Sequence, residues 1–143
     1  MRTRQPLIAL ALCAIALSAL PPSRLSAQGT RLLRHPTVSD REIAFSYGGD
    51  IWVAGREGGD ARRLTSAPGM EGNPHFSPDG RYVAYSGEYA GNWDSYVVEA
   101  TGGTPQRLTW HPGADLVRGW TPDGQSVVFA TNRQNPRKDG VQL

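Results

Sequence analysis

Short apolar runs alternate with turn-forming residues over most of the 143-residue chain. The clearest apolar runs cover residues 82–85 and 127–130, and each follows a Pro-Asp-Gly tripeptide. Continuous apolar runs of this length are typical of strands that are covered on both faces. No long run has the 3.6-residue period of an amphipathic helix. The pattern therefore predicts an all-β chain of short strands.

The Pro-Asp-Gly tripeptide at residues 78–80 predicts a tight hairpin. Proline presets the backbone angle of the second turn residue, aspartate can bond its own backbone, and glycine accepts the left-handed conformation. The strands at 73–76 and 82–86 should then be antiparallel neighbours. Further strands are expected at 94–99 and 105–109, which gives four short strands with tight connections.

This pattern recurs in three partial copies, at residues 39–65, 77–109 and 121–143. The first and second copies differ by about four extra residues around 88–92, which we interpret as a tolerated loop insertion. The elements that recur at an offset of 44 residues are Pro-Asp-Gly (78–80 and 122–124), Gly-Gly (58–59 and 102–103) and Arg-Leu-Thr (63–65 and 107–109).

A four-stranded sheet that is covered on both faces and repeats at this interval is typical of a β-propeller blade. We expect about two and a half TolB-like or WD-like blades of four antiparallel strands. Blade 1 should cover about 31–76, blade 2 about 77–120 and the start of blade 3 about 121–143. Since propellers close with about 4 to 8 blades, these residues should form an incomplete propeller domain, part of a larger ring.

Residues 1–27 have the layout of a secretory signal peptide, with two arginines, a run of apolar and small residues, and small residues before Ala27. An uncleaved anchor is the alternative, but the run is shorter than the roughly 20 residues that span a bilayer. We expect an exported protein, periplasmic or secreted, with a mature chain of residues 28–143 and no membrane attachment after cleavage.

The formal net charge of +2 depends on this N-terminal segment. Without its three arginines, the chain keeps 12 basic and 13 acidic residues, so the balance gives no support for a nucleic-acid partner. Cys13, the only cysteine, lies in the same segment, so no disulfide is expected in the mature chain.

The three histidines lack the companions that catalysis or metal binding requires. Metal sites and catalytic triads combine histidine with acidic or thiol groups. His35 and His111 each precede a proline, and His111 opens a His-Pro-Gly turn. His75 lies in an expected strand, where a packed or channel-facing role is favoured.

Polar and aromatic residues at repeat positions are also interpreted as structural. Asp50 and Asp94 are expected to accept backbone N–H groups at tight turns, and Asp79 and Asp123 belong to the Pro-Asp-Gly turns. Of the four tryptophans (Trp52, Trp93, Trp110 and Trp120), three lie on or beside strands at repeat positions, which favours packing between blades over sugar stacking. Three arginines (Arg62, Arg63 and Arg107) favour a solvated, salt-bridged rim.

No nucleophile elbow, phosphate-binding loop or EF-hand spacing occurs in the sequence. We therefore assign no catalytic, cofactor-binding or metal-binding residue and expect no cofactor.

Two phrases of the sequence are specific beyond the repeat, Leu-Thr-Trp-His-Pro-Gly at 108–113 and Gly-Trp-Thr-Pro-Asp-Gly at 119–124. With them, residues 31–133 resemble the N-terminal β-propeller of tricorn-type serine proteases, and residues 32–36 and 49–52 resemble the start of that domain. The resemblance implies a six-bladed propeller followed by a seven-bladed one, a PDZ domain and a peptidase domain of the C-terminal-processing type. The propellers of that family are thought to channel peptides. Its catalytic serine and histidine lie further along, so none is carried over here.

Two functions of different class follow. The first is a non-catalytic channelling, gating and scaffold domain of an exported tricorn-like serine peptidase that cleaves oligopeptides. Its partners would be peptide substrates, the remaining blades and the peptidase domain, with self-association as a further expectation. The second is a TolB-like periplasmic propeller that binds proteins without catalysis. A prolyl-oligopeptidase-type or amidohydrolase parent is a third interpretation.

Overall fold

The computed structural model describes residues 32–133, which form ten strands in three antiparallel sheets and contain no helix. The expected signal peptide and the end of the third copy lie outside the described residues. The first sheet contains β1 (Arg34–Val38), β2 (Glu42–Tyr47), β3 (Asp50–Gly55) and β4 (Arg62–Arg63). The second contains β5 (Met70–Phe76), β6 (Tyr82–Glu88), β7 (Trp93–Glu99) and β8 (Gln106–Arg107). The third pairs β9 (Asp115–Trp120) with β10 (Val127–Thr131).

The prediction of an all-β partial propeller is confirmed, and the second sheet shows how closely local pattern fixes the strands. The expected hairpin pairs β5 with β6, with Phe76 opposite Val83. β5 starts three residues earlier than predicted, and β8 is only two residues long. Its shortness is consistent with its place at the outer edge of the sheet, where one side has no partner strand.

The blade boundaries expected from the repeat are wrong by one strand. A boundary after residue 76 would separate β5 from β6, and a boundary after residue 120 would separate β9 from β10, yet both pairs are hydrogen-bonded. The repeated phrase starts at the hairpin turn, whereas each sheet starts with the strand before that turn. Sequence repeat and sheet are therefore offset.

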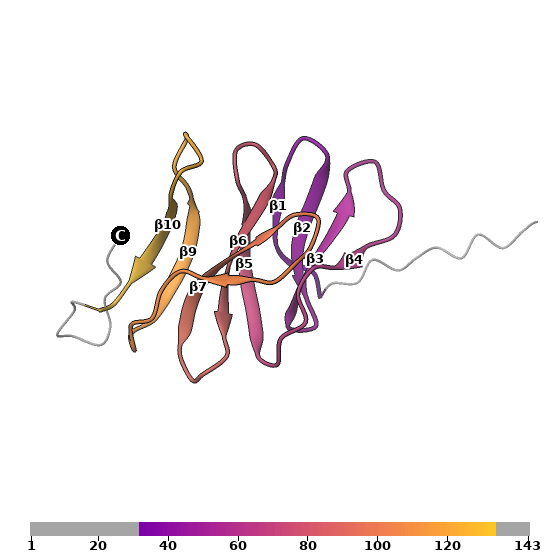
Figure 1. The fold of residues 1–143 in the computed structure, drawn as a ribbon. Helices are drawn as coiled ribbons and strands as arrows, with labels where there is room; N and C mark the ends of the chain where they lie inside the picture. Colours follow the sequence, from indigo (N-terminus) through magenta and orange to yellow (C-terminus); the bar gives the residue numbers. More distant parts are fainter. Residues whose placement is uncertain (1–31, 134–143) are drawn as a thin grey trace, which may run out of the picture.

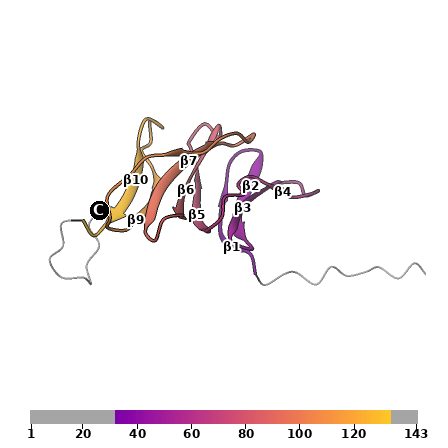
Figure 2. The same ribbon diagram turned by 60° about the horizontal axis from the view of Figure 1, so that its bottom comes forward.

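The three sheets stand side by side, and their first strands β1, β5 and β9 are neighbours (Figures 1 and 2). The core lies between the first and second sheets, where Ile51 and Val53 of β3 pack with Val83 and Tyr85 of β6. On the other side of β6, the hydroxyl of Ser86 accepts a hydrogen bond of 2.9 Å from the backbone N–H of Val117 in β9. β6 is thus covered on both faces, which explains its continuous apolar run.

The third sheet departs from the prediction that both apolar runs are covered on both faces. Val128 of β10 remains 40% exposed, because the part of the chain that the structure describes places no sheet beyond β10. Only Ala130 of this run is buried.

Both Pro-Asp-Gly turns are held by the same hydrogen bonds, as expected for Asp79 and Asp123. Asp79 Oδ1 accepts from the Ser77 hydroxyl at 2.6 Å and from the backbone N–H of Arg81 at 3.0 Å. The Thr121 hydroxyl and the Gln125 N–H bind Asp123 Oδ1 at the same two distances. In each turn these donors lower the pKa of the aspartate, the hydroxyl having the larger effect.

The glycines of these turns also bring neighbouring sheets together. Gly80 has a φ of +72°, and a Cβ added there would lie 3.3 Å from the Cβ of Ser39 in the preceding sheet. Gly124 has a φ of +69°, and a Cβ added there would lie 3.5 Å from Pro78, an ordinary van der Waals distance. The backbone angle therefore favours glycine at both turns, and at Gly80 the close approach of Ser39 adds to this preference.

Gly80→Ala should destabilise the chain more than Gly91→Ala, a matched control with a φ of +87° and open space around its Cα. The control should lose about 1–2 kcal/mol from the left-handed backbone alone. Gly80→Ala should lose more because its methyl group also presses on Ser39. Urea unfolding of the two variants measures the difference, and equal losses would contradict the contact between turns.

Candidate functional site

A set of polar groups joins the end of the second sheet to its third strand. Asp94, at the start of β7, is 2% exposed and forms a 2.5 Å ion pair with Arg107 of β8. The Thr109 hydroxyl donates to Asp94 Oδ1 at 3.2 Å and accepts from the backbone N–H of Ser95 at 3.0 Å. Arg107 also donates to the Thr109 carbonyl oxygen at 2.7 Å. We call Asp94, Arg107 and Thr109 the second clasp.

The same arrangement occurs 44 residues earlier in the first sheet. Arg63 donates to Asp50 at 2.8 Å and to the Thr65 carbonyl oxygen at 2.8 Å. The Thr65 hydroxyl accepts from the backbone N–H of Ile51 at 2.9 Å. Asp50, Arg63 and Thr65 form the first clasp, which fastens the end of each sheet to its third strand.

The clasps correct one interpretation made from the sequence and confirm another. Asp50 and Asp94 were expected to accept backbone N–H groups at turns, but among the described residues they accept from arginine and other side chains. The expected salt-bridged rim is confirmed for Arg63 and Arg107, which pair with Asp50 and Asp94 while their side chains stay partly exposed. The sequence showed the offset of 44 residues for each member, but it did not indicate that the aspartate pairs with the arginine.

Arg62 serves a different purpose from Arg63. Its guanidinium forms a 3.0 Å ion pair with Glu42 in the first sheet and also donates to the carbonyl oxygen of Ala100 in the second. Both partners of the ion pair are partly exposed, so its contribution to stability is small, up to about 1 kcal/mol. Arg62 is thus a link between sheets.

Glu71 of β5 is a buried acid that accepts three hydrogen bonds at the junction between the first and second sheets. It is 4% exposed. One carboxylate oxygen, Oε2, accepts from the Thr65 hydroxyl and from the backbone N–H of Ile51, the latter at 3.2 Å. The other oxygen, Oε1, accepts from the Tyr89 hydroxyl. Burial raises the pKa of Glu71 above its ordinary value, although these three hydrogen bonds act to lower it.

Tyr89 shows that the insertion of the second copy is more than a tolerated loop. The extra residues lie between β6 and β7, as predicted. They carry the Tyr89 ring over Gly69 and Gly87, where a Cβ would approach ring carbons to 2.8 and 2.9 Å. Its hydroxyl lies 3.1 Å from that of Tyr85, and burial raises the pKa of both phenols.

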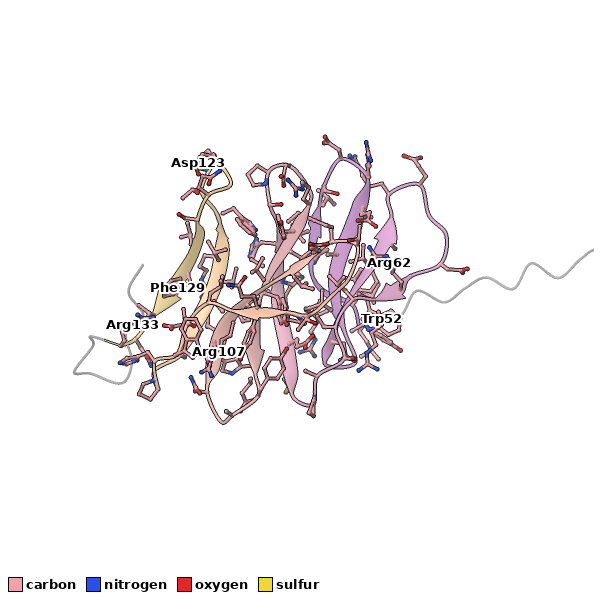
Figure 3. All side chains as sticks on the ribbon, in the orientation of Figure 1. Trp52, Arg62, Arg107, Asp123, Phe129 and Arg133 are labelled. Atoms are coloured by element: carbon pink, nitrogen blue, oxygen red, sulfur yellow. The ribbon has the colours of Figure 1, made fainter. Side chains whose placement is uncertain are left out.

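The junction between the second and third sheets has an acid at the equivalent position, but this acid is paired within its own sheet. Asp115 stands 44 residues after Glu71, is fully buried, and forms a 2.5 Å ion pair with Arg133, which stands 44 residues after Tyr89. The Arg133 guanidinium also lies 5.2 Å from the centre of the Phe129 ring. In Figure 3, Arg133 lies just beyond the end of β10, at the opposite end of the third sheet from the turn that carries Asp123.

The three histidines lie apart from any metal-ligand set. Among residues 32–133, no group of three or more His, Cys, Asp or Glu side chains could hold a metal ion. His111 Nδ1 accepts from the backbone N–H of Gly113 at 2.9 Å, which is a turn contact. His75 of β5 is partly buried, and burial, then Arg118 of β9 and His35 of β1, lower its pKa. His75 thus lies close to a basic residue from each neighbouring first strand.

Only one tryptophan shows a hydrogen bond between sheets. The indole N–H of Trp120 in β9 donates to the His75 carbonyl oxygen in β5 at 2.9 Å, which agrees with the expected packing between blades. Trp52 instead donates to the Tyr47 carbonyl oxygen within its own sheet. Trp110 is 69% exposed, so a prediction of packing between blades is wrong for this residue in the part of the chain that the structure describes.

A groove of about 660 Å³ opens between the first and second sheets, beside the turns that join β1 to β2 and β5 to β6. It is lined by the turn at 39–42, the turn at 78–82 and residues 99–101. Arg41 and Arg81 contribute positive charge, and four acids offset it (Asp40, Glu42, Asp79 and Glu99).

Comparison with known proteins decides the family. Residues 30–143 match the tricorn protease N-terminal beta propeller domain. The chain belongs to this family. Tricorn protease homolog 2 of Streptomyces coelicolor is 40% identical over 68 residues, which cover 47% of this chain and 5% of that protein.

Solved structures agree with a tricorn-type propeller. A crystal structure of the tricorn protease is similar with a TM-score of 0.65 and 27% identity, covering 73% of this chain and 11% of that one. TolB from Acinetobacter baumannii is similar with a TM-score of 0.63 and 26% identity, covering 72% of this chain and 27% of that one. The chain therefore spans a small part of the length of each relative. The described residues include no helix long and apolar enough to cross a membrane.

Thr109→Val should weaken this tricorn-type propeller more than Thr101→Val. Valine matches the shape of threonine but leaves the buried Ser95 N–H without its acceptor, so we expect a loss of about 1–3 kcal/mol. Thr101 is exposed and contacts only Glu99, at 3.4 Å, so its substitution should change stability by less than about 0.5 kcal/mol. Chemical denaturation gives both values, and a neutral Thr109→Val would contradict the clasp.

Proposed function

We propose that this tricorn-type propeller is a non-catalytic domain of an exported serine peptidase, in which it admits, guides and holds oligopeptides. The family match over residues 30–143 is the observation that carries the proposal. The exported location rests on the N-terminal segment, whose basic start and apolar run are typical of a signal peptide.

The arrangement of the sheets supports a guiding role. Propellers surround a central channel, which the first strand of each sheet borders. Here β1, β5 and β9 lie side by side and contribute His35, His75 and Arg118. The positive charge of Arg118 at such a border would attract the terminal carboxylate of a peptide.

The proposal is tested with short fluorescent oligopeptides and the purified chain. We expect binding without hydrolysis. Arg118→Ser should weaken binding about two- to fivefold, since a single exposed charge contact contributes up to about 1 kcal/mol. Arg56→Ser is the control because Arg56 is also exposed but donates only to the carbonyl oxygens of Ser39 and Asp40.

Fluorescence anisotropy measures the affinities, and a peptide-release assay measures turnover. Loss of binding in the Arg56 variant alone, or no binding by the unaltered chain, would contradict the guiding role. Hydrolysis abolished by substitution of a serine within residues 28–143 would contradict a non-catalytic domain.

Protein binding without catalysis is the second candidate, favoured by the similarity to TolB. The two functions differ in what should follow along the gene. A peptidase requires further blades and then a peptidase domain, whereas a TolB-like propeller should end after about six blades, within about 200 further codons. Sequencing the gene beyond codon 143 distinguishes them.

A further inference from the structure

The two junctions between sheets use the same position for an acid but neutralise it differently. At the second junction, the buried Asp115 has Arg133 at 2.5 Å. At the first junction, the equivalent Glu71 accepts only from neutral donors, namely two hydroxyls and one backbone N–H. A buried carboxylate without a cation is costly, and protonation removes that cost.

The charged and titratable groups around Glu71 do not supply that cation. From the first sheet, Asp50 of β3 adds negative potential and is itself paired with Arg63. His35 of β1 lies near Gly72, with its Nδ1 3.9 Å from where a Cβ would be. From the second sheet come the two neutral phenols of Tyr85 and Tyr89.

We propose that Glu71 is a pH-operated latch between the first and second sheets: the neutral carboxyl group closes the junction, and the ionised carboxylate loosens it. The latch consists of Glu71, Thr65, Tyr89 and Tyr85. The latch requires neither a bound peptide nor export of the protein.

A proton chain allows the latch to work without moving heavy atoms. With Glu71 ionised, the Tyr85 hydroxyl donates to Tyr89, and Tyr89 donates to Glu71. With Glu71 neutral, both bonds reverse, since either hydroxyl can act as donor across their 3.1 Å contact. The neutral carboxyl group of Glu71 therefore keeps its hydrogen bond with Tyr89, and no buried charge remains.

The sign of the pH dependence follows from the raised pKa of Glu71. Because the folded-state pKa lies above the ordinary value of 4.5, the stabilisation is fully present below that value. It is lost as the pH rises through the raised value. Acid therefore tightens the first junction.

The Ile51 amide reports directly on the latch because its N–H donates to Thr65 and to Glu71. Its hydrogen-exchange protection, corrected for intrinsic exchange at each pH, should fall about tenfold for each unit by which the pKa of Glu71 is raised. The Ser95 amide, which donates to Thr109 in the second sheet, is the internal reference and should not follow this titration.

Glu71→Gln should keep the Ile51 amide protected and abolish its titration, since glutamine carries no charge. Tyr89→Phe is the second variant: it removes a hydrogen bond that lowers the pKa of Glu71, so the midpoint should move to higher pH. An Ile51 titration that persists in Glu71→Gln would overturn the latch. So would a Tyr89→Phe midpoint that is unchanged or lower, and this second test remains available if Glu71→Gln does not fold.

Discussion

A sheet in this chain buries its faces only against other sheets, because the described residues contain no helix to cover them. β6 illustrates the constraint: Val83 and Tyr85 lie in the core toward the first sheet, and Ser86 binds β9 of the third. The second sheet has two neighbours and is the best covered. β10 lacks a described neighbour on one side and leaves Val128 exposed. The propeller architecture is a direct consequence. Each added sheet covers one face of its neighbour but exposes a face of its own, and only a closed ring covers every face.

Face-to-face contact between sheets brings backbone and side-chain polar groups out of water, and the chain satisfies them with repeated devices. The clasps fasten the end of a sheet to its own third strand, so that the chain leaves one sheet in a fixed direction toward the next. The junction acid Glu71 then binds the first strand of the second sheet to Ile51 and Thr65 of the first sheet, whereas Asp115 pairs with Arg133 in its own sheet. Buried polar groups need such partners because an unsatisfied one costs about 1–3 kcal/mol.

The sequence predicted those features that depend on neighbouring residues. The turn at Asp79 was recoverable because proline, aspartate and glycine each have a local conformational role. The apolar run of β6 was recoverable because its length and turn boundaries are typical of a doubly covered strand. The family resemblance was also recoverable, because its phrases lie within the repeat.

The features that were missed join residues far apart in the sequence. Asp94 and Arg107 are 13 residues apart, and Glu71 and Tyr89 are 18 apart. No turn or periodicity rule connects such pairs. A comparison of the copies for pairs that recur together, rather than for single recurring residues, would have indicated the clasps. It would not have indicated that Tyr89 and Arg133 are equivalent, since a phenol and a guanidinium share only the ability to donate to a carboxylate.

The central claim is that adjacent sheets cover one another, and the most direct measurement is native-state hydrogen exchange of β6 after Val117→Ala in β9. Val117 is fully buried, so the substitution weakens the third sheet through a cavity and changes no residue of the second. The account predicts reduced protection of the Val83 and Tyr85 amides, although both belong to a different sheet. Unchanged protection of these amides, with loss confined to β9 and β10, would show that the sheets do not depend on one another.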